Sequence, residues 1–413
     1  MQSGVIARRL RGVLRRPRAA AEGGPDRSAT IHVGFYAPAN LNTMDGSAIW
    51  VESAIQTLHV DPRLRISLVL KAAERRSIIT DTIRGLAGVT VVPRPRDSPP
   101  FDAAEAVDRL EQLDRADPFD VVIVRSYEVC LVAAIRGAFA GRLWAAYVLE
   151  PERDPAADEH RAGLERIVGH ASRVLVQSTA MADLFRSLVP AVGPALLLLP
   201  PAVPVDGPVY AHPERPIRRL LYTGKFHPFY RIEELIDAFV MVRATHRGLS
   251  FHVVGDKVFQ PPDDPDWAPS LRRRLRGTPG LVWHGALPRP DVLRLLSGGG
   301  LAMSIWNFEH GPQANDLVVS TKLLDYAISG LPILLTRTTA QEALLGVDYP
   351  LFLEPHEPVV TAIGRALGDL SRSTAAARAA RATALRFTYP AVYDGLRSAI
   401  DAIETLAGSE DRR

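Results

Sequence analysis

The sequence predicts an α/β protein built from two doubly wound, Rossmann-like domains, and three observations support this. The chain has 413 residues, too many for one ordinary core and sufficient for two α/β domains. From Ile31 onward, short apolar runs alternate with amphipathic stretches, as in a parallel sheet flanked by helices. The alternation stops at a proline-rich stretch and then restarts, which divides the chain into two halves.

The first half contains seven short apolar runs and five amphipathic segments. The expected strands are 31–36, 65–71, 89–92, 120–124, 143–149, 173–177 and 195–199. The expected helices are 48–59, 103–114, 129–138, 158–170 and 181–188. Six prolines between positions 200 and 216 then form a stiff connector, because proline continues neither a helix nor a central strand.

The second half repeats this pattern. Strands are expected at 219–223, 250–254, 281–284, 301–304, 332–335 and 350–353. Helices are expected at 232–244, 267–275, 290–296, 321–329, 340–345 and 359–370. The predicted organisation is a basic tail (1–28), a first domain (29–200), a linker (201–216), a second domain (217–386) and a final helix (387–406).

Composition excludes several classes of protein. The single cysteine, Cys130, lies in an apolar run, so neither an intramolecular disulfide nor a cysteine metal cluster is expected. The net charge is +3, but residues 1–28 hold seven arginines and two carboxylates, so the rest of the chain is slightly negative. The body of the protein therefore gives no indication of nucleic-acid binding.

The basic tail has two interpretations of equal weight. Apolar residues at helical spacing between the arginines, from Val5 to Leu14, suit a short helix on an anionic membrane surface. A solvated, disordered tail fits equally well, because the helix would be short and would end at Pro17. We expect a cytoplasmic protein, peripheral on the inner membrane face under the first interpretation. No stretch approaches the ~18 apolar residues of a membrane span.

Two segments of the second half carry residues suited to a diphosphate. In the first, Gly224 and Lys225 follow an expected strand, and Arg231 begins the next helix. Ligands of open α/β sheets bind beyond the carboxyl ends of the strands, and cations beside a helix N-terminus attract phosphate. The alternative is a pair of ordinary solvated cations.

In the second segment, Ser320 or Thr321 precedes or begins a helix that carries Lys322 and Asp325 three residues apart. A carboxylate at this position would accept hydrogen bonds from ribose hydroxyls, while Lys322 and the helix N-terminus meet phosphate. The alternative is a surface ion pair between Lys322 and Asp325.

These segments resemble the donor-binding half of retaining GT-B glycosyltransferases of the large family 4. Gly224-Lys225 with Arg231 is similar to that family's pair of diphosphate-binding cations, with the two basic residue types exchanged. The run from Ser320 to Tyr326, followed by Gly330-Leu331-Pro332, is similar to its Lys-Leu-x-Glu-Tyr…Gly-x-Pro signature, with Asp325 at the ribose-binding glutamate. Gly255 and His284 match the next two strand ends, the latter near the nucleobase.

The sequence departs from the family at one position. Members with a Glu-x7-Glu motif carry a first glutamate where this chain has Leu317. The neighbouring Asp316 is a candidate substitute if the loop shifts register. The preceding loop offers further candidates for the sugar hydroxyls: Asn307, Glu309, His310, Gln313 and Asn315.

In the first half, the resemblance points to the loop after the first strand. Its Gly46 and Ser47 are expected to face the donor phosphate, where their backbone amides would stabilise the leaving diphosphate. The alternative is a polar loop in which Ser47 caps a helix. Arg125 and Glu150 end two later strands and are expected on the acceptor side.

Together these features predict an enzyme that moves a sugar from a nucleoside-diphosphate sugar to a hydroxyl of a glycan, lipid-linked or small-molecule acceptor. Lys225 and Arg231 are the expected catalytic residues. The resemblance implies retention of configuration and transfer without a metal or other cofactor. Two other classes remain open: an epimerase or phosphorylase on the same fold, and a non-catalytic sugar-nucleotide-binding protein.

Overall fold

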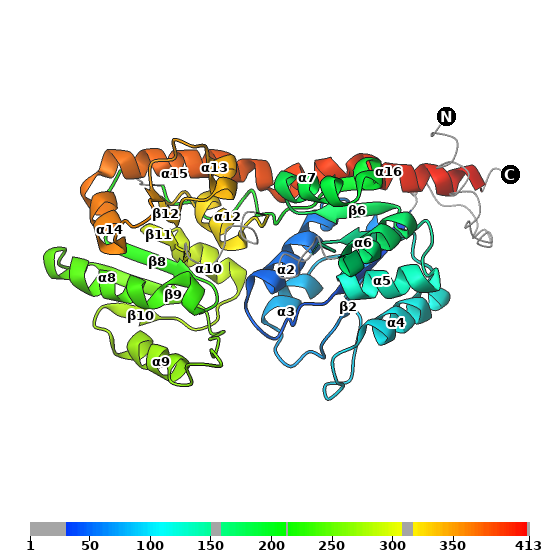
Figure 1. Ribbon diagram of the computed structural model, residues 1–413, viewed down its shortest axis with the longest axis horizontal. Helices are drawn as coiled ribbons and strands as arrows, with labels where there is room; N and C mark the ends of the chain where they lie inside the picture. The colour runs from blue at the N-terminus through cyan, green and yellow to red at the C-terminus, as the bar shows by residue number, and fades with distance from the viewer. Residues whose placement is uncertain (1–29, 150–157, 212–213, 308–316, 411–413) are drawn as a thin grey trace.

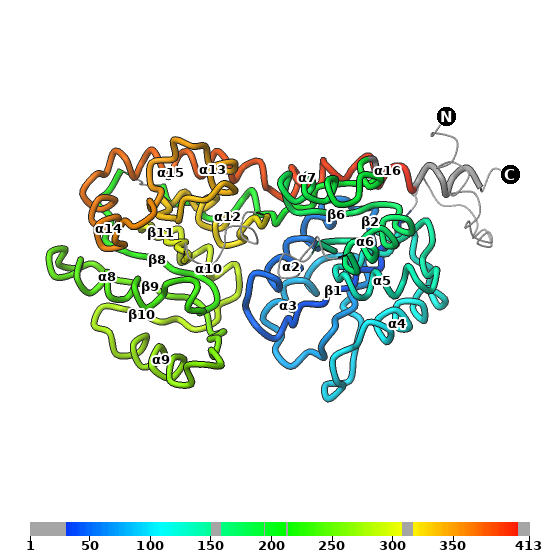
Figure 2. The backbone as a smooth tube through the Cα atoms, in the orientation of Figure 1, coloured from blue at the N-terminus to red at the C-terminus, as the bar shows by residue number. Residues whose placement is uncertain are grey.

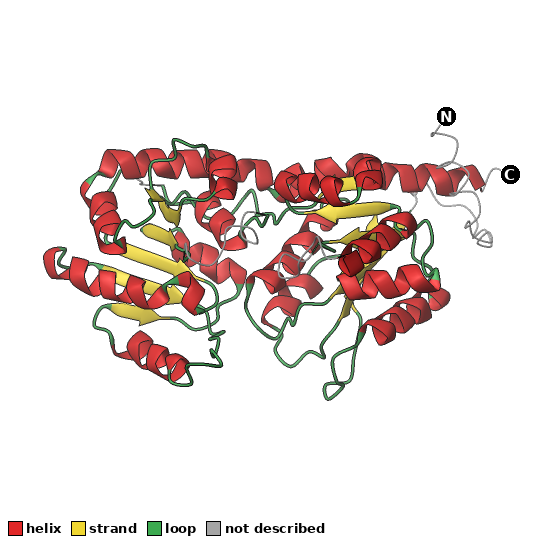
Figure 3. Cartoon of the chain, viewed as in Figure 1, coloured by secondary structure: helices red, strands yellow, loops and turns green. Residues whose placement is uncertain are grey.

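The computed structural model describes residues 30–149, 158–211, 214–307 and 317–410. It forms two α/β domains that lie side by side along the long axis of the molecule (Figure 1). All strand pairs described in the two sheets are parallel. In each domain, helices cover the sheet (Figure 3). The prediction of two doubly wound α/β domains is confirmed.

The first domain has a seven-stranded sheet in the order β3-β2-β1-β4-β5-β6-β7. Its strands are β1 (Ile31–Ala37), β2 (Leu64–Leu70), β3 (Val89–Val91), β4 (Val121–Arg125), β5 (Leu143–Ala146), β6 (Arg173–Val176) and β7 (Leu196–Leu198). Its helices are α2 (Gly46–His59), α3 (Ile78–Arg84), α4 (Ala103–Ala116), α5 (Tyr127–Arg136), α6 (Asp158–His170) and α7 (Thr179–Leu188), with a 3-10 turn η1 (Pro190–Ala195).

The second domain has a six-stranded sheet in the order β10-β9-β8-β11-β12-β13. Its strands are β8 (Arg219–Thr223), β9 (Ser250–Val254), β10 (Leu281–Trp283), β11 (Leu301–Ser304), β12 (Ile333–Thr336) and β13 (Phe352–Leu353). Its helices are α8 (Ile232–Thr245), α9 (Trp267–Gly277), α10 (Arg289–Leu296), α12 (Thr321–Ile328), α13 (Thr339–Leu345), α14 (Val359–Gly368) and α15 (Leu370–Ala384), with 3-10 turns η2 (Pro228–Tyr230) and η3 (Leu385–Phe387).

Two helices were not predicted from the sequence. Helix α3 is short, and its N-cap residue Ser77 makes no side-chain capping bond, so the usual start signal is missing. Helix α15 buries mainly alanines, among them Ala376 and Ala380, against the second domain. Alanine gives a weak apolar signal, although its small side chain permits close helix packing.

The last helix, α16 (Tyr389–Glu410), returns from the second domain and passes along the first (Figure 2). Its apolar residues, including Val392, Leu396 and Ile400, belong to one core cluster of the first domain. The chain thus crosses between the domains twice. The two crossing segments pair at Val203, whose N–H donates to Phe387 O at 2.9 Å and whose carbonyl accepts from Tyr389 N at 3.1 Å.

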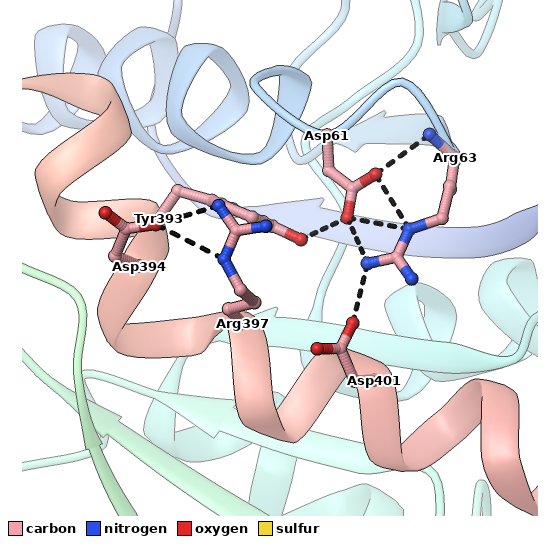
Figure 4. A network of polar contacts seen from close by, with 6 residues as sticks. All are labelled: Asp61, Arg63, Tyr393, Asp394, Arg397 and Asp401. Atoms are coloured by element: carbon pink, nitrogen blue, oxygen red, sulfur yellow. Dashed lines mark hydrogen bonds and ion pairs between the residues drawn. The ribbon is translucent and has the colours of Figure 1, made fainter.

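A polar network fastens α16 to the first domain (Figure 4). The Tyr393 hydroxyl donates to Asp61, and Arg63 Nη2 donates both to Asp61 at 2.6 Å and to Asp401 at 2.7 Å. Burial opposes ionisation of Asp61, but hydrogen bonds from Arg63 and Tyr393 lower its pKa to about 2. The network therefore stays ionised at neutral pH. Within the described residues, every helix is too short or too polar to cross a membrane.

Candidate donor site

Two glycines bring the carboxyl ends of β8 and β9 together. Gly224 and Gly255 have φ values of +133° and +138°, which favour glycine strongly. A Cβ atom on Gly255 would lie 2.0 Å from the carbonyl oxygen of Gly224. Gly255 N also donates to Gly285 O at 2.7 Å. The tight approach of these backbones fixes the position of Lys225, the next residue after Gly224.

Lys225 and Lys322 both lie near the Tyr230 ring. The Lys322 Nζ atom is 4.6 Å from the centre of the Tyr230 ring and 4.9 Å from that of Tyr222, and Lys225 Nζ is 5.7 Å from Tyr230. Neither lysine has a carboxylate partner among the described residues. Burial, followed by the charge of Lys225, lowers the pKa of Lys322 to about 7. The pair is a local excess of positive charge that an anion would relieve.

Helix α12 presents its N-terminus at the same place. Ser320 is the N-cap residue, but its side chain makes no capping hydrogen bond. The backbone N–H groups of the first turn are therefore available to donate to a ligand. Thr321 lies against α2 of the first domain, since a Cβ on Gly46 would be 3.6 Å from Thr321 Oγ1. The N-termini of α2 and α12 therefore meet at the domain boundary (Figure 1).

The N-terminus of α2 carries its own polar contacts. Asp45 accepts a hydrogen bond from Ala48 N at 3.0 Å and caps the helix, the role that one sequence interpretation gave to Ser47. Arg125 Nη1 donates to Ser47 O at 3.2 Å, and its guanidinium lies 4.5 Å from the centre of the Trp50 ring. Burial lowers the pKa of Arg125. Arg125 thus holds the start of α2.

Ion pairs link the two domains around these helix ends. Lys257 Nζ, after β9, binds the Asp45 carboxylate. Arg76 Nη1 donates to Asp256 Oδ2 at 2.8 Å. Sequence reasoning missed Lys257 and Arg76 because their partners lie 212 and 180 residues away. No local pattern reports such a pairing.

In the described part of the chain, Arg231 makes no contact with Lys225 or Lys322. It sits in the left-handed region at φ +49°, at the start of α8. Its Nε and Nη2 atoms donate to Glu234 at 2.7 and 2.8 Å. A contact between Arg231 and a donor diphosphate would require the guanidinium to leave Glu234.

Asp325 lies in a buried cluster at the two chain crossings. Its Oδ1 accepts hydrogen bonds from Arg289 Nε at 3.1 Å and Nη2 at 2.7 Å, and Asp325 is 6% exposed. Arg289 also donates to Ala202 O at 2.9 Å and to the Tyr389 hydroxyl at 3.1 Å. Lys322 and Asp325 therefore contact different groups and form no ion pair. No described residue donates to Asp325 Oδ2.

Glu52 of α2 faces this cluster from the first domain and is 3% exposed. Burial raises its pKa to about 7, while the charge of Arg289 opposes and that of Asp325 adds to the rise. Burial also raises the pKa of Asp325, offset in part by Arg289. The cluster joins both domains, and sequence reasoning did not identify Glu52 or Arg289 as part of the site.

His284 points to a neighbouring strand. Its Nε2 atom lies 3.0 Å from Nδ1 of His252, in the middle of β9. Burial lowers the pKa of both rings, that of His252 to about 4, so both are neutral at pH 7. The neighbouring Trp283, rather than His284, contacts the carboxyl end of β9, where its Nε1 donates to Gly255 O at 2.8 Å.

The candidate sugar and acceptor contacts fall mostly outside the described residues. This applies to Glu309, His310, Gln313, Asn315, Asp316 and Glu150. Asn307 is described, and its N–H donates to Phe229 O at 2.8 Å. Within the described ranges, no group of three or more His, Cys, Asp or Glu side chains is arranged to hold a metal ion.

Solved structures share this architecture. Sucrose-phosphate synthase from Thermosynechococcus elongatus aligns with a TM-score of 0.66 at 12% identity, over 91% of this chain and 100% of that one. HepE from Anabaena, in complex with UDP-glucose, aligns with a TM-score of 0.65 at 14% identity, over 90% and 100%. The chain has the GT-B fold. A glycosyltransferase from Rickettsia africae also aligns, with a TM-score of 0.62 at 11% identity, over 91% and 98%. No family model and no curated protein sequence matches the chain.

Proposed function

We propose that this protein is a glycosyltransferase that moves a sugar from a nucleoside-diphosphate sugar to an acceptor hydroxyl. The observation that carries the proposal is the placement of Lys225 and Lys322 without carboxylate partners, beside the uncapped N-terminus of α12. Two cations and free backbone amides form a seat for a diphosphate. The seat lies where the N-termini of α2 and α12 come together, at the boundary between the two domains.

The chemical task of the seat is to stabilise the leaving group. When the anomeric C–O bond breaks, its electron pair remains on the β-phosphate oxygen, and the acceptor hydroxyl loses its proton as it bonds to the anomeric carbon. Fixed cations lower this barrier most where water is excluded. Lys322 supports this role because its side chain is partly buried and its pKa is lowered, so a bound diphosphate would restore its charge. Arg231 joins only if it exchanges Glu234 for phosphate.

Ribose recognition is assigned to Asp325 Oδ2. Arg289 occupies Oδ1 and fixes the carboxylate, which leaves Oδ2 available for a ribose hydroxyl. Uridine donors are the first to test, since the structure of HepE was obtained with UDP-glucose. Retention and independence from metal, which the family 4 resemblance implies, are part of the proposal. Proton NMR of the product anomer and activity in excess EDTA test them separately.

The proposal includes a cytoplasmic location. We include an acceptor at the membrane surface in the proposal only if the basic tail binds anionic lipid. Deletion of residues 1–28, followed by sedimentation with phosphatidylglycerol vesicles, tests this. Equal vesicle binding by the intact and shortened proteins would show that the tail does not bind the membrane.

The function is tested by ligand screening and by substitution. A thermal-shift screen of nucleoside diphosphates and their sugars should raise the melting temperature with the cognate donor. Lys225→Ala and Lys322→Ala should each slow donor turnover at least tenfold. Arg231→Ala tests whether the second predicted cation takes part. Arg247→Ala, at an exposed site away from the seat, is the control. Turnover within a few-fold of wild type in both folded lysine variants would refute the leaving-group assignment.

The rival classes are separated by products. An epimerase or phosphorylase would convert labelled donor without an acceptor alcohol. A non-catalytic protein would bind donor and release no nucleoside diphosphate with any acceptor.

A further inference from the structure

Three successive loops of the first domain are tied together at the carboxyl-terminal edge of its sheet. In the loop after β1, Asn42 Nδ2 donates to Ala73 O at 2.9 Å, and its Oδ1 accepts from Arg76 N at 2.9 Å. The loop after β2 joins the loop after β3, because Phe101 N donates to Lys71 O at 2.9 Å. These bonds make one continuous surface, the basic rim, from residues 71–76 and 92–101.

The basic rim holds more positive than negative charge. Lys71, Arg75 and Arg96 are exposed, and none of the three has a carboxylate partner among the described residues. Arg96 Nη2 lies 3.3 Å from Arg75 O, which brings the two arginine-bearing loops together. The nearby Glu74 is unavailable to them, since it is bound by Arg84 and Thr80. The rim therefore attracts anions.

A small pocket opens beside these cations, at the ends of β2 and β3. Its volume is about 260 Å³, and its lining combines an apolar wall with Ser98, Arg94 and Arg109. The Arg94 guanidinium lies over the Phe101 ring, 3.5 Å from its centre, and Nη1 donates to Lys71 O at 2.7 Å. Arg94 is thus held in place by a ring and a backbone carbonyl rather than by a carboxylate.

The rim also lies close to the candidate donor site. Arg76, within the rim, forms the ion pair with Asp256 of the second domain, next to Lys257. Asn42, which ties the rim together, is three residues from Asp45, the partner of Lys257. A molecule bound at the rim therefore lies on the first-domain side of the boundary that the donor seat occupies.

We propose that the basic rim binds a phosphate group of the acceptor, so that the acceptor is a phosphate-bearing sugar, either soluble or linked to a lipid. This rests on the proposed function, and it assigns the acceptor class. An anionic phosphate pairs with several arginines through charge-assisted hydrogen bonds, and it neutralises cations that have no carboxylate partner among the described residues. The adjoining pocket would hold a part of the sugar.

The test separates binding at the rim from the sugar transfer. The variant Arg75→Gln/Arg96→Gln removes two exposed charges, and Arg115→Gln, at the exposed end of α4, is the matched control. With UDP saturating the donor site, titration calorimetry with inorganic phosphate should show binding to wild type and control, weakened at least tenfold in the double variant. Equal binding by all three proteins, or by none, would overturn the proposal.

Transfer assays then identify the source of the phosphate. Hexose 6-phosphates and the matching free hexoses form one arm, and a polyprenyl-phosphate-linked sugar in phosphatidylcholine vesicles forms the other. The arm that contains the true acceptor type should show a KM for that acceptor at least tenfold higher in the double variant than in wild type. The KM for the free hexose should change less than twofold. Loss of transfer to free and phosphorylated acceptors alike would refute the rim. Failure of the wild-type protein to bind any nucleoside diphosphate would instead refute the proposed function.

Discussion

Lys322 gives the sharpest prediction, because its partly buried ammonium lies close to another lysine and has a lowered pKa. With a pKa of about 7, half of the Lys322 amines are neutral at pH 7 in the free protein. A bound diphosphate favours the charged form, so binding takes up a proton above this pH. Donor affinity should then fall about 16-fold between pH 7.0 and pH 8.5, and the slope should approach about tenfold per pH unit at the upper end of this range.

The assay is isothermal titration with a nucleoside-diphosphate sugar at half-unit pH steps. A sugar nucleotide is suitable because neither of its phosphates titrates in this range. Proton uptake, read from buffers of different ionisation enthalpy, should approach one per site at pH 8.5. Lys322→Arg keeps its charge at every pH and should abolish the dependence. A wild-type affinity that is flat across this range, or a slope retained in Lys322→Arg, would refute the reasoning.

Three further predictions concern stability, measured by urea unfolding. Arg289→Met leaves the buried Asp325 carboxylate unpaired and should lower the unfolding free energy by about 3–5 kcal/mol, with most of the loss recovered by adding Asp325→Leu; no recovery would mean that the pair is not the cause. Glu52→Gln should match wild type at pH 4.5 and exceed it above pH 7 by up to about 3 kcal/mol, because a raised carboxyl pKa means that stability is lost as pH rises from the ordinary value to about 7; equal curves would contradict this. Gly255→Ala should cost at least about 2 kcal/mol, since its Cβ would meet a backbone oxygen at 2.0 Å, whereas Gly277→Ala, with no atom within 4 Å, should cost nothing.

The excess charge at Lys322 also has a cost in the free protein. A lysine pKa below its usual value means that the folded state holds fewer protons than the unfolded state between pH 7 and 10.5. Unfolding free energy contributed by this group therefore rises with pH in that window and is lowest below pH 7. A site that destabilises the empty protein is common where function requires a charge for its ligand.

Sequence patterns predicted most of the strands because burial on both faces of a parallel sheet leaves continuous apolar runs. Strands 219–223, 250–254 and 301–304 were predicted to the residue. Helices α3 and α15 were missed because one is short and uncapped and the other packs through alanine. The sequence patterns therefore predicted the strands and the two-domain organisation more completely than they predicted the helices.

The candidate site was only partly accessible to sequence reasoning. Lys225, Lys322 and Gly255 lie in short motifs beside strand or helix ends, so their neighbourhood followed from the order of elements. The partners of Asp325 and Arg231 did not. Arg289 lies 36 residues from Asp325, and no periodic pattern joins them. The Arg231–Glu234 bond lies within one helical turn, but Arg231 had two acceptable partners, a carboxylate and a phosphate, and sequence does not choose between them.

The most direct test of the donor seat is a structure of the protein with a bound UDP-sugar. We predict that the diphosphate lies within hydrogen-bond distance of Lys225 and Lys322, with the first-turn amides of α12 donating to it and the ribose at Asp325. A nucleotide bound elsewhere, with both lysines still resting on the Tyr230 ring and no phosphate between them, would contradict it.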